Sequence, residues 1–328
     1  MPDALSSSRL EPMPIERLGD RSPKRNDSVD WVTPIDRSRW FYCETLTPLY
    51  YTDVYSTLGR QHRLRYNQLT GIYSNELIGF LETVILRRTL DRLIARADLG
   101  LPEALRAALL RFRDDEARHA EQWRRLNRLS EPDWYAARDY RILGMSAPAA
   151  AVASLVADHP VLFPLVLWMQ LAQEERSIEI SRRIARAPAG EIEPRYVAVY
   201  RAHLQDEVRH VQIDWHLIEH LFARRTAAAR RFNAWAFRRI VETLFLTPAS
   251  ASARIIRLLV EEFPELEPLK SRMLDELAAL SRSDAYQAMM YSRATTPITF
   301  ALFDRFPEFH RMQDRLRAYR PQPNGGLA

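Results

Sequence analysis

The chain contains the pattern D-E-x-R-H twice, as DEARH and as DEVRH. In each copy a glutamate precedes a histidine by three residues: Glu116 precedes His119, and Glu207 precedes His210. On an α-helix this offset places both side chains on one face, one turn apart, so both can reach one metal ion. Each copy is therefore a candidate half of a metal site.

Two copies of the pattern are stronger evidence for a metal site than either copy alone. About 0.6 E-x-x-H matches are expected by chance at this composition, whereas the five-residue pattern is expected only ~0.004 times. Ion pairs on a solvated helix face are the alternative reading. The apolar neighbours of the two copies argue against that reading; they are Leu110, Leu126, Val208, Val211 and Ile213.

The chemistry that fits two such motifs is a pair of iron ions. Two adjacent irons need carboxylates to offset their charge and an imidazole each. Four-helix bundles supply one Glu from each of two helices and a Glu-x-x-His motif from each of the other two. The sequence therefore predicts two irons, with Glu116, His119, Glu207 and His210 among the ligands.

The other charged residues of the two motifs can support the histidines. A histidine that binds a metal needs an acceptor for its second ring nitrogen. Asp115 and Asp206 are placed to accept from the histidine of the opposite helix. Arg118 and Arg209 are placed to neutralise those aspartates.

Two further carboxylates must come from the long helix that precedes each motif. In the first of these helices we prefer Glu82, which has apolar residues one turn away, with Glu76 as the alternate or as a supporting residue. In the second we prefer Glu175, near the centre of an apolar face, with Glu179 as the alternate. Glu174 is expected to point away.

His203 is a seventh candidate ligand. It lies four residues before Glu207 and seven before His210, so the three side chains share one helical face. A lone histidine there would more often be a packed core residue. Its place one turn before a carboxylate ligand favours a ligand, which would make the site unusually rich in nitrogen.

Helices must position these residues. Glycine is scarce, strand-like alternation is not sustained, and Leu, Ala, Arg and Glu recur at helical spacing. We predict an all-α fold with a four-helix bundle core and additional N- and C-terminal helices. An irregular crossover is expected at 130–147. The predicted helical segments are 38–58, 63–97, 102–128, 148–158, 160–187, 193–223, 226–246, 249–263 and 269–318.

The composition of the sequence indicates the domain boundaries and argues against two kinds of partner, nucleic acid and membrane. We expect a mobile or loosely docked arm at 1–35, one helical domain at 36–318 and a tail at 319–328. The net charge of +5 comes from arginines that are interleaved with acids, which argues against a nucleic-acid surface. The most apolar stretch, 161–172, is too short to span a membrane.

The compartment is inferred from two observations. No apolar run follows the first residues, so we expect no secretory signal. The single cysteine, Cys43, excludes an intramolecular disulfide and fits a reducing cytoplasm.

The ligand pattern resembles the p-aminobenzoate N-oxygenase family of di-iron enzymes, which includes arylamine oxygenases of antibiotic biosynthesis. The resemblance covers Glu82 to His210, and its most specific element is His203 before the second E-x-x-H. It implies a ferritin-like helical core, a di-iron centre that activates O₂, and oxygen transfer to an amine nitrogen.

Other activities remain open at this point. C–H hydroxylation or desaturation could use the same site, and a non-catalytic ferritin-like protein is a third class. We expect a homodimer that acts on a small-molecule or carrier-tethered amine. An external reductase or ferredoxin must supply electrons, because the chain has no G-x-G-x-x-G fingerprint for a flavin or nicotinamide.

Overall fold

The computed structural model describes residues 11–18, 29–246 and 249–322. Throughout these residues the regular structure is helical, and the one extended pairing is an isolated bridge between Trp40 and Ile192. The all-α prediction is confirmed.

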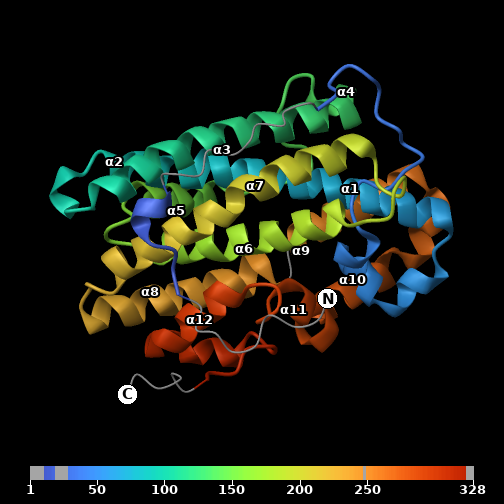
Figure 1. Ribbon diagram of the computed structural model, residues 1–328. Helices are drawn as coiled ribbons and strands as arrows, with labels where there is room; N and C mark the ends of the chain where they lie inside the picture. Colours follow the sequence, from blue (N-terminus) through green and yellow to red (C-terminus); the bar gives the residue numbers. More distant parts are fainter. Residues whose placement is uncertain (1–10, 19–28, 247–248, 323–328) are drawn as a thin grey trace, which may run out of the picture.

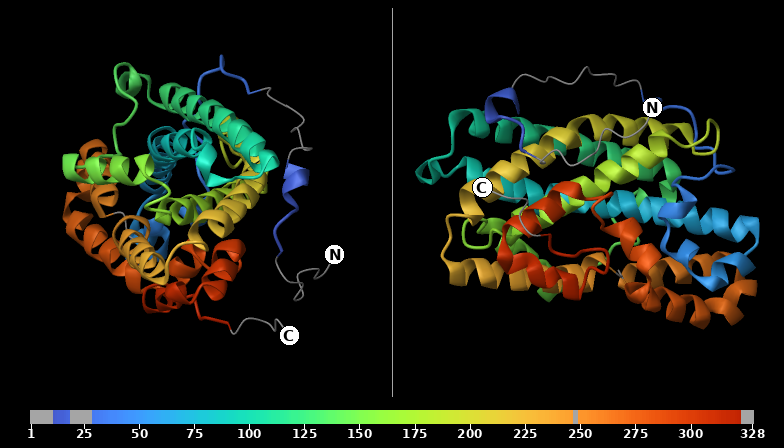
Figure 2. Two further views of the ribbon diagram at one scale, coloured as in Figure 1. Left: turned by 90° about the vertical axis from the view of Figure 1, so that its left-hand side faces the viewer. Right: turned by 60° about the horizontal axis from the view of Figure 1, so that its bottom comes forward.

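Four long helical segments form the central bundle (Figure 1). They are α1 (Arg60–Phe80), which continues through η5 (Leu81–Leu86) into α2 (Arg87–Ile94), then α3 (Glu103–Ser130), α6 (Leu165–Ala185) and α7 (Pro194–Leu217). Helix α1 packs along α3, α6 packs along α7, and α3 packs against α7. Figure 2 shows the four segments side by side in the view along their length.

Shorter helices surround this bundle. They are α4 (Pro132–Tyr135), α5 (Ala147–Asp158), α8 (Ala227–Ile240), α9 (Ala249–Glu262), α10 (Lys270–Ala279), α11 (Asp284–Met290) and α12 (Pro297–Arg305). Helix α5 lies on α2, α9 on α1, and both α8 and α12 on α6. The helices after α7 thus cover the side of the bundle that faces down in Figure 1.

Helix α3 shows how the sequence positions the site. Its buried residues recur every three or four positions, so they form one stripe along the helix. The stripe is apolar near Leu109 and Phe112, polar from Asp115 to His119, and apolar again at Trp123. The polar part of the stripe therefore lies in the middle of the bundle. Leu110 and Val208, by contrast, point outward and are exposed.

The predicted helix at 38–58 is wrong. The structure has three short 3₁₀ helices there, η2 (Glu44–Leu46), η3 (Pro48–Tyr51) and η4 (Asp53–Thr57). Proline at the start of η3 removes one backbone donor. The hydroxyls of Thr47, Thr52 and Thr57 each donate to the carbonyl three residues earlier, which competes with continuous helix.

The predicted helix at 269–318 is interrupted. It divides into α10, α11 and α12, with the 3₁₀ helices η10 (Leu280–Arg282) and η11 (Pro307–Asp314) between and after them. Ser283 caps α11 by accepting from the Tyr286 amide, and Pro297 begins α12. The remaining short elements are η1 (Ile15–Leu18), η6 (Ala97–Leu99), η7 (Ile218–Phe222), η8 (Val241–Phe245) and η9 (Pro264–Leu269).

Part of the N-terminal arm is docked on the bundle. The short helix η1 packs against α3 and α7, and Leu18 is buried. The backbone of Met13 hydrogen-bonds to Gln212 and to His216. Residues 1–10 and 19–28 of the predicted arm lie outside the described residues.

The boundary of the predicted tail also differs from expectation. Tyr319 is fully buried, and its hydroxyl donates to Asp304. The packed domain therefore continues past residue 318, and the predicted tail from 323 onward lies outside the described residues.

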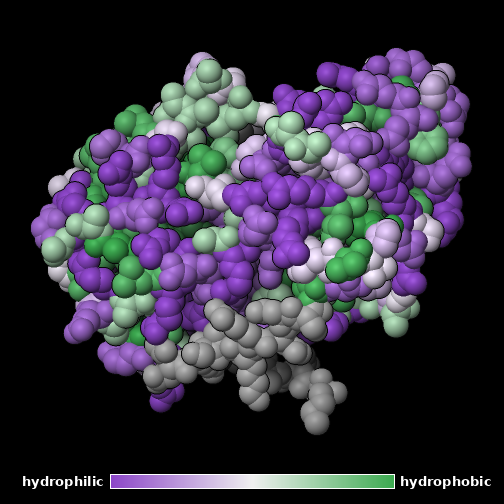
Figure 3. Space-filling view, turned by 90° about the horizontal axis from the view of Figure 1, so that it is seen from above, coloured by the Kyte–Doolittle hydropathy of each residue, from purple (hydrophilic) through white to green (hydrophobic). Residues whose placement is uncertain are grey.

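The surface is polar over the helices nearest the site. In Figure 3, hydrophilic side chains dominate the face seen from above, with apolar groups scattered among them. Exposed acids and arginines pair on helix α3, as Arg124 does with Glu121. Among the described helices, none is long and apolar enough to cross a membrane.

Candidate metal centre

The centre of the bundle gathers ligand-type side chains from three of its helical segments. One group consists of Glu116 and His119 on α3 with Glu207 and His210 on α7, and their ligand atoms all lie within 4.8 Å of one another. A second group of the same spread consists of Glu82 on η5, His119 and His203. The two groups share His119, so they form one continuous centre.

The two motif glutamates lie between the two motif histidines. Oε1 of Glu116 is 3.5 Å from Nδ1 of His119 and 3.1 Å from Nδ1 of His210. Oε1 of Glu207 is 3.5 Å from each of the same two nitrogens. Each glutamate can therefore serve both halves of the centre, as bridging carboxylates require.

Each motif aspartate contacts the histidine of the opposite helix. Nε2 of His119 lies 3.1 Å from Asp206, and Nε2 of His210 lies 3.4 Å from Asp115. Burial alone would lower the pKa of His119. The hydrogen bond to Asp206 and the nearby glutamates outweigh burial and raise that pKa well above its usual value. The contacts leave Nδ1 of both rings directed at the glutamates.

The motif arginines neutralise the aspartates. Arg118 lies 2.9 Å from Asp115 and 2.6 Å from Asp206. Arg209 lies 3.2 Å from Asp206 and also pairs with Asp115. Burial would raise the pKa of Asp206, but the hydrogen bond and charge of His119, together with other cations, hold it below its usual value.

His203 faces the centre through the opposite nitrogen. Its Nε2 is 3.2 Å from Glu82 and 2.9 Å from Glu207, while its Nδ1 is 3.1 Å from the hydroxyl of Ser177. Burial and the charge of His119 lower the pKa of His203 to about 4. The ring is therefore neutral at ordinary pH, the form that binds metals.

The fourth helix presents Glu174 rather than Glu175. Both oxygens of Glu175 accept from backbone amides at the start of α12, Ile298 at 2.7 Å and Thr299 at 2.6 Å. Burial raises the pKa of Glu175 to about 7. The structure thus does not bring Glu175 to the centre, because α12 occupies its carboxylate.

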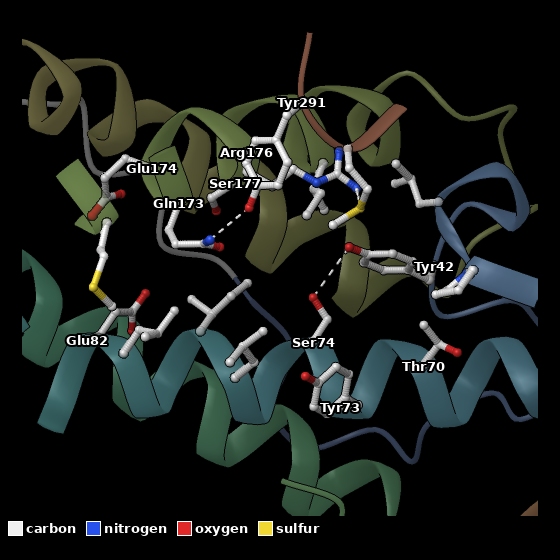
Figure 4. Close-up of a pocket in the computed structure, with 18 of the residues that line it drawn as sticks. Tyr42, Thr70, Tyr73, Ser74, Glu82, Gln173, Glu174, Arg176, Ser177 and Tyr291 are labelled. Atoms are coloured by element: carbon white, nitrogen blue, oxygen red, sulfur yellow. Dashed lines mark hydrogen bonds between the residues drawn. The ribbon is translucent and has the colours of Figure 1, made fainter. Parts of the chain in front are cut away.

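Glu174 lies on the face of α6 that meets the site. It is one turn from Gln170, which donates to Asp214 on α7, and one turn from Ser177, which contacts His203. Its side chain is only 7% exposed and forms no hydrogen bond or ion pair within the described part of the chain. Figure 4 shows Glu174 and Glu82 at the same end of one cavity.

The two other candidate carboxylates lie elsewhere. Glu76 accepts from the hydroxyl of Tyr135 and from backbone amides of the crossover, including Ile142. It therefore fastens the crossover to α1. Glu179 pairs with Arg182 and Arg183. Neither residue contacts the ligand-type side chains.

Sequence reasoning missed several residues around the centre. Trp123, one turn after His119, donates to Glu82 over 3.0 Å. Asp214, one turn after His210, is fully buried, and burial raises its pKa well above the usual value. Their spacing from the motif histidines was a signal available in the sequence.

The donor atoms fit metal ions. Buried polar atoms normally have hydrogen-bond partners. Among the described residues, several buried atoms of the centre have no hydrogen-bond partner although they lie side by side: Oε2 of Glu82, both oxygens of Glu116 and Glu207, and Nδ1 of His119 and His210. Carboxylates mixed with imidazoles suit iron and similar transition metals. The centre is thus arranged to hold cations.

A cavity of about 150 Å³ leads to this centre. Glu82, Glu174 and His203 line this cavity, and Figure 4 shows Glu82 and Glu174 at one end of it. Most of its remaining wall is apolar or aromatic; the residues include Leu77, Ile78, Leu81, Ile85, Val166, Met169, Tyr42, Tyr286 and Tyr291. A small organic molecule in this cavity would meet the centre directly.

A four-helix bundle with two Glu-x-x-His motifs and carboxylates from the other two helices defines the ferritin-like di-iron carboxylate proteins. The family model described as p-aminobenzoate N-oxygenase AurF matches residues 13–302. The chain belongs to this family, which confirms the resemblance seen in the ligand pattern. No curated protein matches the chain. The family implies a di-iron centre and an oxygenase.

Replacing Glu116 or Glu207 with Ala should remove iron from at least one position and leave helix content intact. Bundle packing, rather than metal, should supply most of the stability. Iron analysis and circular dichroism of the purified variants measure both quantities. Unfolding of both variants upon metal loss would contradict this expectation.

Glu174→Ala should lower iron content, whereas Glu175→Ala should retain iron and lower stability. Glu175→Ala leaves two amides of α12 without acceptors, that of Thr299 buried and that of Ile298 partly buried, so we expect a loss of about 1–2 kcal/mol in the free energy of unfolding. Iron content and the free energy of unfolding are measured for both variants, by iron analysis and by denaturant titration. Because the two residues are adjacent, each variant is the control for the other. Loss of iron in Glu175→Ala, with iron retained in Glu174→Ala, would make Glu175 the ligand.

Proposed function

We propose that the protein is a non-haem di-iron oxygenase that uses O₂ to oxygenate the nitrogen of a small amine, giving a hydroxylamine, nitroso or nitro product. One observation carries the proposal: Glu82 and His203 belong both to the ligand cluster and to the cavity wall, and Glu174 lines the same wall. A substrate in the cavity would therefore place one end beside the metals.

The proposed iron ligands are Glu82, Glu116, His119, Glu174, His203, Glu207 and His210. When bound, two irons supply the reducing equivalents and Lewis acidity that O₂ activation requires. The chain's own residues orient the ligands: Trp123 holds Glu82, Ser177 holds His203, and the motif aspartates hold the other imidazoles. The apolar wall excludes bulk water from the reacting end.

The electron balance supports an external donor. Converting an amine to a hydroxylamine inserts one oxygen atom of O₂, and the other leaves as water with two electrons and two protons from outside. We propose that a reductase or ferredoxin supplies these electrons, since the sequence has no dinucleotide fingerprint.

Protein made with adequate iron should contain about two irons per chain. After reduction and exposure to O₂ it should convert arylamines into products that carry oxygen on nitrogen. Metal analysis and mass spectrometry with ¹⁸O₂ test both parts. A single zinc or no metal would overturn the di-iron proposal, and oxygen found only on carbon would favour a C–H hydroxylase.

His203→Ala should retain most of the iron, because six proposed ligands remain, and N-oxygenation should fall by about 10–100-fold. The lost imidazole changes the electron density at the metals and opens a coordination position. Rapid-mixing absorption spectra of reduced, iron-matched proteins with O₂ should differ between wild type and variant. His159→Ala, at an exposed histidine, is the control. Identical spectra for wild type and His203→Ala would make His203 a packing residue.

A further inference from the structure

A series of aromatic side chains leads away from the ligand cluster. Trp123 lies at its inner end: the indole donates its N–H to Glu82 over 3.0 Å, and its ring centroid is 5.0 Å from that of His203. The next ring is that of Tyr200 on α7, also 5.0 Å from the indole. Tyr42 follows, with its ring centroid 6.1 Å from that of Tyr200. Successive rings are thus as close as aromatic pairs in direct contact.

The inner part of this series is sealed from solvent. Trp123 is 1% exposed, and Tyr200 is completely buried. The hydroxyl of Tyr200 donates to Oδ1 of Asn75, which is completely buried as well. A ring that loses an electron here is shielded from reductants in solution. A neighbouring side chain must therefore restore that electron.

The outer end of the series lies at the cavity. Tyr42 lines the cavity, where its hydroxyl is 3.4 Å from that of the half-buried Ser74 (Figure 4). Burial raises the pKa of Tyr42 to about 12, so the phenol keeps its proton in the resting protein. Oxidation of a phenol makes it strongly acidic, and the proton can then leave past Ser74 into the cavity. Tyr42 can therefore release an electron and a proton together.

Oxygen activation creates a need for such a series. This step rests on the proposed function, in which the reduced irons pass two electrons to O₂. An amine in the cavity takes up the oxidising power that remains. Without an amine, that oxidising power falls on the nearest side chains, among them the ligand-type residues His119 and His203. Indole and phenol lose an electron more readily than imidazole, so Trp123 is oxidised before the histidine that it contacts.

We propose that Trp123, Tyr200 and Tyr42 form an electron relay that protects the centre when O₂ reacts without substrate. Trp123 gives one electron to the centre. Tyr42 replaces that electron through Tyr200 and releases its phenol proton to the cavity. Trp123 then gives a second electron, and its indole proton passes to Glu82 along the hydrogen bond between them.

The relay completes the reduction of O₂ to two molecules of water. Of the four electrons, two come from the irons, one from Trp123 and one from Tyr42. Of the four protons, one comes from the indole and three from solvent, which has gained the phenol proton. The external donor that reduces the irons then returns one electron to each oxidised ring, and solvent returns the protons.

The test exposes reduced, iron-matched protein to O₂ without an amine and records electron paramagnetic resonance spectra of samples frozen during the reaction. Wild type should show tyrosyl and tryptophanyl radicals, which ring-deuterated tyrosine and tryptophan distinguish. Tyr200→Phe should lose the tyrosyl signal and keep the tryptophanyl signal, whereas Trp123→Phe should lose both. Tyr196→Phe is the matched control, because it removes a buried hydroxyl one turn earlier on the same helix. It should behave as wild type.

Repeated cycles of reduction and O₂ exposure provide a second readout, permanent oxidation located by peptide mass spectrometry. In wild type the added oxygen should lie on Trp123 and Tyr42. In Trp123→Phe it should move to His203, and iron content should fall with each cycle. Zinc-loaded protein, which cannot reduce O₂, should show neither change.

Consumption of O₂ by wild type without any aromatic radical would overturn the relay. So would an unchanged tyrosyl signal in Tyr200→Phe. If Trp123→Phe does not fold or does not hold iron, Tyr200→Phe and its control Tyr196→Phe decide the matter.

Hydrogen peroxide separates the relay from the proposed function, because it brings the oxidised centre to the same oxidation level without a reductant or an amine. Aromatic radicals formed with peroxide in a protein that oxygenates no amine would refute the proposed reaction and leave the relay standing. Protein that reacts with neither O₂ nor peroxide would refute both.

Discussion

The structure depends on holding carboxylates and imidazoles in the dry centre of a helical bundle. Unpaired charges there would be costly, so each one needs a partner of opposite charge or a metal. The motif histidines are held by aspartates, and the aspartates by Arg118 and Arg209. The side chain of Arg118 is 29% exposed, so this chain of alternating charges runs from the centre to the surface.

Much of the centre could be predicted from the sequence because two helices repeat one pattern. An E-x-x-H pair fixes its own geometry through the helical period, and the repeat makes coincidence improbable. Glu82 and His203 followed from their spacing and apolar surroundings. The sequence could not decide between Glu174 and Glu175, because α6 is buried on nearly every side. When no face of a helix is exposed, the spacing of its apolar residues does not show which face meets the site.

The fold was predictable where burial is periodic. The long helices of the bundle recur close to their expected bounds, and proline is absent from their interiors. Segment 38–58 has comparable apolar content, yet its threonines bond to their own backbone and Pro48 interrupts it. Sequence periodicity also does not reveal η5, the π-helical turn that carries Glu82. Such turns often occur at functional sites and alter the direction of side chains.

Four consecutive residues of α6 face four different neighbours. Glu174 lines the end of the cavity where Glu82 lies, and Glu175 faces the start of α12. Arg176 faces the Met289 backbone, and Ser177 faces the imidazole of His203. Successive side chains on a helix are about 100° apart, so all four contacts depend on one rotational phase. A one-residue insertion or deletion upstream within α6 would therefore disrupt the metal side, the cavity wall and the C-terminal cover together. Substitution of cavity side chains can therefore change which substrate binds. A change in the length of α6 cannot do so without disrupting the site.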